Sequence, residues 1–145
     1  MSDPMSIAGT VVGIISLGLT LTQGLLDYYA AFKEKNSHVA FTTKRLTRLH
    51  EMLQTLHHQL QQRKFRPDEQ KIRMSICDCI QDCHEVVNEL EIELEKFRSS
   101  PTNSSFELRA VGRRLIYPLR QSTLQKLDED IDALISSFSL ALQLL

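Results

Sequence analysis

Apolar residues recur at steps of three and four along most of the chain, which is the spacing of one face of an α-helix. The pattern covers four segments, at about residues 3–35, 37–62, 67–98 and 122–145. No segment alternates apolar and polar residues between turn signals, so no β-sheet is expected. Four amphipathic helices joined by short connections predict an all-α, up-and-down bundle of four main helices.

A shorter amphipathic segment, residues 106–117, precedes the last helix and predicts a short extra basic helix, which Pro118 should break or kink. The basic residues of this region are Arg109, Arg113, Arg114 and Arg120. Two interpretations stay open. The arginines either pair with the acidic stretch Glu85–Glu95 across the bundle, or they meet anionic lipid head groups, at about 1 kcal/mol each.

The first helical segment is apolar on more than one side. It has no charged side chain between Asp3 and Asp27, and Val12, Ile15 and Leu19 form a second apolar row beside the main one. At about 1.5 Å per residue this neutral run spans roughly 34 Å, which is enough to cross the core of a bilayer. Such a helix is either central to a protein core or suited to lipid.

The first segment also holds four of the five glycines, namely Gly9, Gly13, Gly18 and Gly24. Each costs about 1 kcal/mol of helix propensity relative to alanine, so a packing role should offset the loss. Gly9 and Gly13 form a G-x-x-x-G step, which lets two helix backbones approach closely and is most useful in a membrane. The alternative is that the glycines let a crowded central helix pack tightly against its neighbours.

Length and charge limit the class of protein. A chain of 145 residues is expected to form one domain, 1–145, with its own core. A net charge of −1 disfavours nucleic acid as a partner. Three cysteines and the lack of a secretory signal favour the cytoplasm. The chain ends on Leu144 and Leu145 without a helix stop signal, so we expect it to continue into a longer protein.

Candidate chemistry is sparse. Cys77, Cys79, Cys83 and His84 lie close in the sequence, but on a helix Cys77 points about 160° away from Cys83. Structural zinc normally takes four ligands with looped spacing, so no metal or cofactor is expected. The sequence offers no catalytic triad, phosphate-binding loop or carboxylate pair, and we expect no enzymatic activity.

The two ends of the chain resemble the HeLo-like N-terminal domain of fungal STAND proteins, which are NOD-like receptors. The matching stretches are Asp3–Gly18, Gln23–Tyr29, Tyr117–Arg120, Ser122–Leu127 and Ser139–Gln143. The resemblance implies a helical bundle related to that of the mixed-lineage kinase-like necroptosis effector. It also implies a nucleotide-binding oligomerisation domain downstream and a role in programmed cell death, such as heterokaryon incompatibility or innate immunity.

In that family picture, oligomerisation frees the first helix to insert into the plasma membrane. Mapped onto this sequence, the inserting residues are Ile7, Val11, Val12, Ile14, Ile15, Leu17 and Leu19. Gly9, Gly13 and Gly18 would serve helix packing, and the four arginines of the basic segment would meet anionic membrane lipids. The alternative is a helical interaction domain that binds a partner's helix and never enters lipid.

Overall fold

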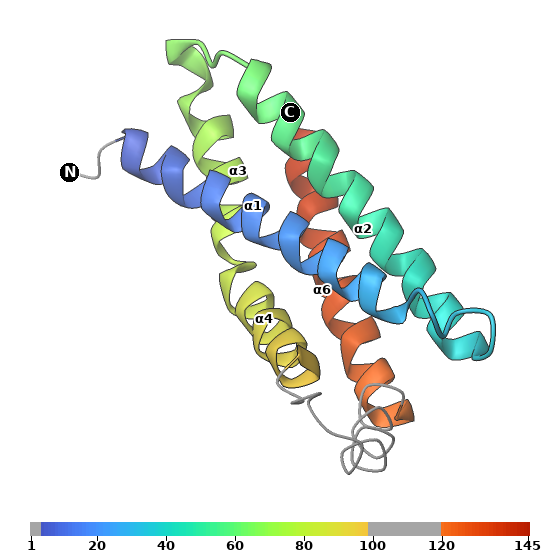
Figure 1. Ribbon diagram of the computed structural model, residues 1–145. Helices are drawn as coiled ribbons and strands as arrows, with labels where there is room; N and C mark the ends of the chain where they lie inside the picture. Colours follow the sequence, from blue (N-terminus) through green and yellow to red (C-terminus); the bar gives the residue numbers. More distant parts are fainter. Residues whose placement is uncertain (1–3, 99–119) are drawn as a thin grey trace.

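The computed structural model describes the backbone of residues 4–98 and 120–145, and the side chains of residues 11–97 and 120–145 (Figure 1). Its elements are α1 (Pro4–Tyr29), α2 (Ser37–Gln62), the 3₁₀ turn η1 (Pro67–Glu69), α3 (Gln70–Gln81), α4 (His84–Arg98) and α6 (Gln121–Leu144). Every regular element in these ranges is helical. The predicted all-α class is therefore confirmed. The predicted basic helix at 106–117 lies outside the described residues.

The helices form a bundle in which each main rod runs opposite to the one before it in the chain (Figure 1). α1 packs against α2, α3 and α4, and α6 packs against the same three helices from the other side. α1 and α6 are therefore diagonal partners, while α2 and the α3–α4 pair fill the other two positions. This arrangement confirms the up-and-down bundle.

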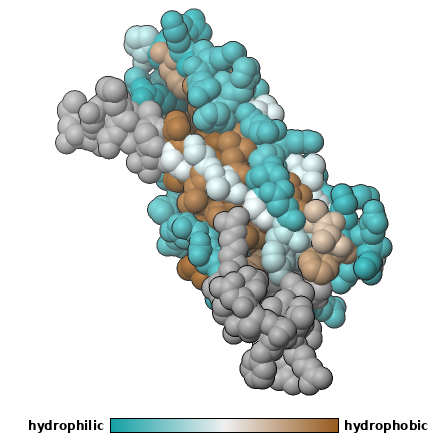
Figure 2. Space-filling model, viewed as in Figure 1, coloured by the Kyte–Doolittle hydropathy of each residue, from teal (hydrophilic) through white to brown (hydrophobic). Residues whose placement is uncertain are grey.

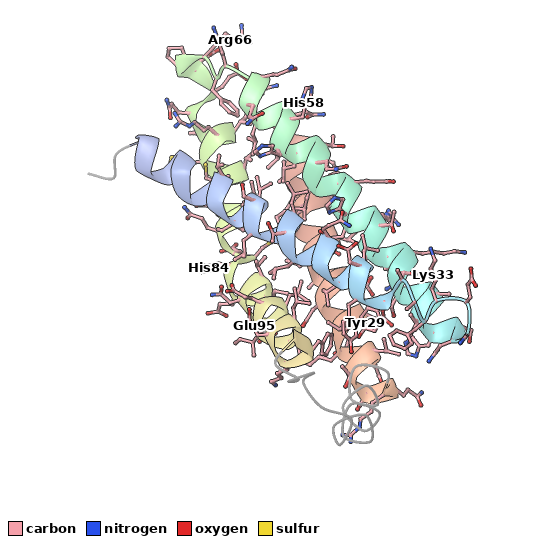
Figure 3. All side chains as sticks on the ribbon, in the orientation of Figure 1. Tyr29, Lys33, His58, Arg66, His84 and Glu95 are labelled. Atoms are coloured by element: carbon pink, nitrogen blue, oxygen red, sulfur yellow. The ribbon has the colours of Figure 1, made fainter. Side chains whose placement is uncertain are left out.

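The predicted apolar rows meet in one core. The fully covered side chains include Leu46, Leu49, Leu53 and Leu56 on α2, and Leu127, Ile131, Leu134 and Phe138 on α6. Figure 3 shows the contrast between inside and outside: Tyr29 lies among the helices, whereas Lys33, His58 and Glu95 point to solvent. The burial of these rows gives the bundle its main stabilisation.

The third predicted helix is wrong in one respect, because residues 67–98 form two helices instead of one. The backbone N–H of Cys83 donates to the carbonyl oxygen of Ile80, three residues back, at 3.1 Å. This tighter bond ends the α-helical series at Gln81, and α4 restarts at His84. No glycine or proline marks the break, so the apolar spacing gave no sign of it.

The first helix also ends earlier than predicted, at Tyr29 instead of about residue 35. Residues 30–35 form turns, and the N–H of Asn36 donates to the carbonyl oxygen of Phe32 at 3.1 Å. The side chain of Asn36 then caps α2, because its oxygen accepts hydrogen bonds from the N–H groups of His38 and Val39.

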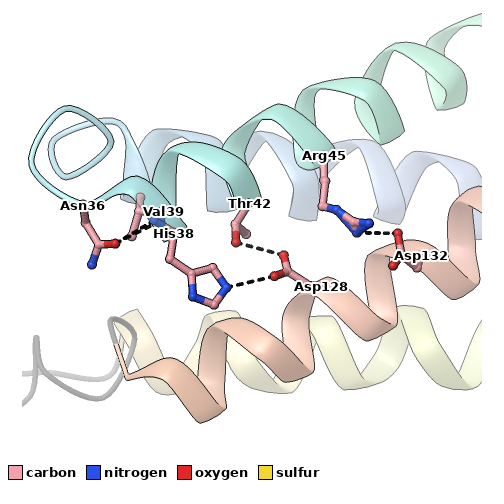
Figure 4. Close-up of polar contacts among 7 residues, drawn as sticks. All are labelled: Asn36, His38, Val39, Thr42, Arg45, Asp128 and Asp132. Atoms are coloured by element: carbon pink, nitrogen blue, oxygen red, sulfur yellow. Dashed lines mark hydrogen bonds and ion pairs between the residues drawn. The ribbon is translucent and has the colours of Figure 1, made fainter.

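Polar contacts at one end of the bundle join α2 to α6 (Figure 4). The hydroxyl of Thr42 donates to Oδ1 of Asp128 at 2.9 Å, and Nε2 of His38 lies 3.0 Å from Oδ2 of the same carboxylate. One turn further along, Arg45 donates to Asp132 at 2.6 Å. These contacts fix the position of α6 along α2.

Candidate functional site: the first helix

The solvent-facing side of α1 carries no charge over most of its described length. Its exposed residues before Asp27 are Val12, Gly13, Ser16, Thr20 and Gln23, which we call the neutral face. A helix on the surface of a soluble bundle normally puts charged residues on this side, as α6 does with Lys126, Glu129 and Asp132. Figure 2 shows the result as a pale and brown band along α1 between hydrophilic margins.

The polar groups of α1 are largely satisfied within the helix itself. The Thr20 hydroxyl donates to the carbonyl oxygen of Ser16 at 3.1 Å, and the Thr22 hydroxyl donates to that of Gly18 at 2.8 Å. Near the carboxyl end, the Gln23 amide donates to Asp27 at 2.8 Å. These three hydrogen bonds lie within α1, so they are kept if α1 passes from the bundle into lipid.

The opposite side of α1 is firmly packed. Ile15, Leu25 and Tyr29 are completely buried, and burial raises the pKa of the neighbouring Tyr28 phenol. The ring of Tyr28 stacks on Phe97 of α4 at 5.2 Å between centroids. These contacts anchor the carboxyl-terminal half of α1 to the bundle.

A partly buried polar contact also joins α1 to α2. Oγ1 of Thr22 lies 2.7 Å from Nδ1 of His50. The Thr22 hydroxyl donates to the carbonyl oxygen of Gly18, so its oxygen can accept a hydrogen bond from Nδ1–H of His50. With the proton on Nδ1, Nε2 of His50 can accept from the side-chain amide of Gln54 at 3.3 Å. One histidine thus connects the two helices, a role that its position in the sequence did not indicate.

The residues predicted to insert into a membrane do not form one surface in this state. Val11, Ile14 and Ile15 are buried in the core, and Leu17 and Leu19 are half-buried against it. Val12 alone among those with described side chains is exposed, at 39%. The side chain of Ile7 lies outside the described residues. A lipid-facing surface that includes all of them would require α1 to leave the bundle.

The glycines predicted to serve packing have different surroundings. A Cβ atom at Gly18 would lie 3.1 Å from Cδ1 of Leu53, so Gly18 does allow α1 and α2 to approach closely. A Cβ atom at Gly13 would meet no described atom within 4 Å, so this glycine mediates no close contact inside the described bundle. The surroundings of Gly9 are outside the described residues.

The basic and acidic residues are only partly placed. Arg109, Arg113 and Arg114 lie outside the described residues, and Arg120 is exposed at the start of α6. In the acidic stretch most side chains face solvent, but Glu93 is only 4% exposed. Its carboxylate lies 3.6 Å from the Lys96 ammonium and 3.9 Å from that of Lys126 on α6.

The cysteines lie at the edge of the core. Cys83 is buried while Cys77 and Cys79 are half-buried, and burial raises the pKa of all three thiols. Within residues 11–97 and 120–145 no three histidine, cysteine or acidic side chains are grouped as they would be around a metal ion.

The fold and the first helix together define a helical-bundle domain with an unusually neutral outer helix. Residues 2–117 match the family described as pigment biosynthesis cluster protein PigL N-terminal, and the chain belongs to this family. It is 35% identical over 127 residues to azaphilone pigments biosynthesis cluster protein L of Monascus ruber. The aligned region covers 87% of this chain but 27% of that relative, so the chain spans about a quarter of the relative's length. No solved structure matches the chain significantly.

Proposed function

We propose that this domain is a non-enzymatic signalling module of a longer fungal protein, whose first helix leaves the bundle and enters an anionic membrane when copies of the chain assemble. In the resting state α1 is held by its core contacts and by Thr22–His50. In the assembled state lipid replaces the other helices as its surroundings. The protein would then move from the cytoplasm to the plasma membrane.

The observation that supports the proposal is the neutral face of α1. Residues Val11–Tyr29 form a 19-residue stretch that is long and apolar enough to span a membrane, and less than half of it is buried. A core helix can meet the same criteria of length and composition. A core helix gains nothing, however, from an uncharged outer side on which the Thr20 hydroxyl bonds within the helix, whereas a helix that must be surrounded by lipid needs uncharged residues and internally bonded polar groups.

The energetics favour a two-state mechanism over spontaneous insertion. Pulling α1 from the core exposes Ile15, Leu21 and Leu25, at about 2 kcal/mol for each side chain. A bilayer covers these side chains again, but the faces of α2, α3 and α4 that they contacted stay uncovered. Assembly of several copies would offset that cost by covering the open faces and raising the local concentration of α1.

The comparisons are consistent with one domain of a larger protein. The family is an N-terminal one, and the relative from Monascus ruber is several times longer than the region aligned. The remainder of such a protein would supply the clustering signal, as a downstream nucleotide-binding domain does in the STAND proteins that the sequence resembles. Cell death is the output that this resemblance adds to the proposal.

Three lysines on the neutral face test the proposal without disturbing the core. Val12→Lys, Ser16→Lys and Thr20→Lys all change exposed positions, so the bundle should still fold. Each lysine opposes insertion by about 3 kcal/mol at the centre of a membrane helix. The matched control places three lysines on exposed positions of α6, as Gln125→Lys, Ser136→Lys and Gln143→Lys, with the same net charge.

The measurement is dye release from anionic vesicles by the purified chain, with circular dichroism as the check on folding. We expect the α1 variant to lose release and the α6 variant to keep it. Equal release by both variants would refute insertion of α1. Vesicles that stay intact with the unaltered chain, under conditions that cluster it, would instead favour the alternative of a helical interaction domain.

A further inference from the structure

A mostly apolar cavity of about 280 Å³ lies where the amino-terminal half of α1 meets the ends of α2 and α3. Its lining residues are Val11, Val12, Leu60, Arg63, Phe65, Arg73, Ile76 and Cys77. In Figure 1 this is the end of the bundle at which α1 begins and α2 ends. The proposed function makes no use of this cavity.

The wall of the cavity contains a guanidinium group that is only partly satisfied. The two terminal nitrogens of Arg63 donate to Glu69 at 2.6 Å and to the carbonyl oxygen of Leu145. Its Nε atom is buried and has no hydrogen-bond partner among the described residues. A buried N–H donor without a partner is unfavourable, and a ligand oxygen would relieve that cost.

The surrounding charge is positive. The connection from Arg63 to Arg73 holds five basic residues and two acidic ones, in a chain whose total charge is −1. Both of those end residues line the cavity. Cζ of Arg63 lies over the ring of Phe65, 5.1 Å from the ring centroid. The ring adds a flat apolar surface to the wall. An apolar interior with a cationic wall suits a molecule that is itself apolar with one acidic end.

We propose that this cavity binds a small amphipathic anion, with its apolar part against Val11, Val12 and Ile76 and its acidic group at Arg63. The volume of about 280 Å³ lies just below the usual range for ligand pockets, so the ligand is a single short chain or ring system. Because α1, α2 and α3 each supply part of the wall, the bound ligand connects the three helices. It therefore stabilises the folded bundle.

A pair of matched ligands tests the proposal on the 145-residue chain. Octanoate and octanamide have the same chain length, but octanoate alone carries a charge. We expect octanoate to bind one per chain in isothermal titration calorimetry, about tenfold more tightly than octanamide, because a hydrogen bond to a charged group is the stronger kind. Inorganic phosphate, which has no apolar part, should not bind measurably.

Two substitutions fill the cavity from two different helices. Cys77→Phe on α3 and Val12→Phe on α1 each add an aromatic ring, and each should weaken octanoate binding by about tenfold or more. Ile92→Phe on α4 is the control, since Ile92 is 56% exposed and does not line the cavity. The use of two cavity variants, with folding checked by circular dichroism, covers the case in which one of them unfolds.

Equal binding of octanoate and octanamide would overturn the proposal, as would unchanged binding in both cavity variants. None of these outcomes involves a membrane. The vesicle experiment on α1 can therefore fail while this one succeeds, and the reverse also holds.

Discussion

At the scale of single residues, Asp130 on α6 is a charge in an unfavourable place. Its Oδ2 atom is buried and lacks a hydrogen-bond partner among the described residues. Burial raises the pKa of this carboxyl, and the nearby negative charge of Glu89 on α4 raises it further, while Lys126 opposes the rise. The bundle therefore favours the protonated form of this carboxyl more than water does.

Replacing Asp130 should show the cost as a function of pH. In the unfolded chain an aspartate has a pKa of about 3.9. Because the folded pKa is higher, the folded state binds more protons between the two values, and stability falls as pH rises through that window. Asp130→Asn should therefore raise the free energy of unfolding at pH 7, and the gain should vanish below about pH 4.

The measurement is urea unfolding of both proteins at several pH values. Asp132→Asn on the same helix is the control. Asp132 forms an exposed ion pair with Arg45, so this substitution removes a favourable contact instead of an unfavourable charge. A gain for Asp130→Asn that is the same at pH 7 and below pH 4 would contradict the electrostatic explanation.

Asp130 also marks the limit of what the sequence could reveal about single residues. By helical spacing Asp130 lies outside the apolar row of α6, and within that helix its side chain is indeed not part of the buried row. Its unfavourable environment comes from Glu89, which belongs to another helix about forty residues away in the sequence. The Thr22–His50 contact escaped prediction for the same reason.

At the scale of elements, the spacing of apolar residues predicted most of the core. It did not predict how far around each helix the buried side extends. The row of Val12, Ile15 and Leu19 was treated as one surface, yet Ile15 is completely buried and Val12 is 39% exposed. Because α1 contacts three helices, a wide part of its circumference is buried. The boundary between the buried and exposed parts of α1 passes through that row of residues. Which residues of α1 are buried therefore depends on where α2, α3 and α4 lie around it.

The glycines of α1 allow a direct test of packing against helix propensity. Gly13→Ala should raise the free energy of unfolding by about 1 kcal/mol, because alanine favours the helix and the added methyl meets no described atom. Gly18→Ala should gain clearly less, or lose stability, because its methyl would lie 3.1 Å from Leu53 in the packed core. Urea unfolding of the two variants measures both values. Equal stabilisation by the two substitutions would show that Gly18 has no packing role.

At the scale of the whole molecule, four apolar helical rows with short connections were enough to predict the architecture, because few other folds bury four such faces. The split between α3 and α4 could not be predicted, since it depends on a local change of hydrogen bonding without a glycine or proline. The candidate site was only partly predictable. The uncharged run of α1 is visible in the sequence, but the neutral face can be separated from the buried one only when the neighbours of α1 are known.

If α1 must leave the bundle to act, joining it covalently to α2 should prevent membrane permeabilisation. Cysteines at Thr22 and His50, whose side chains lie 2.7 Å apart, can be linked by a short bifunctional thiol reagent once Cys77, Cys79 and Cys83 are replaced by serine or alanine. The control links Thr42 to Asp128 in the same way, which fastens α2 to α6 at a comparable separation of 2.9 Å and leaves α1 unattached.

Dye release from anionic vesicles, before and after linking, separates two ways of reaching the membrane. We expect the α1–α2 link to abolish release and the α2–α6 link to preserve it, because only the first link holds α1 against the core. Loss of release in both linked proteins would mean that the whole bundle must open. Release that persists with α1 linked would mean that the folded bundle acts on lipid from its surface, and the extraction of α1 would then have to be abandoned.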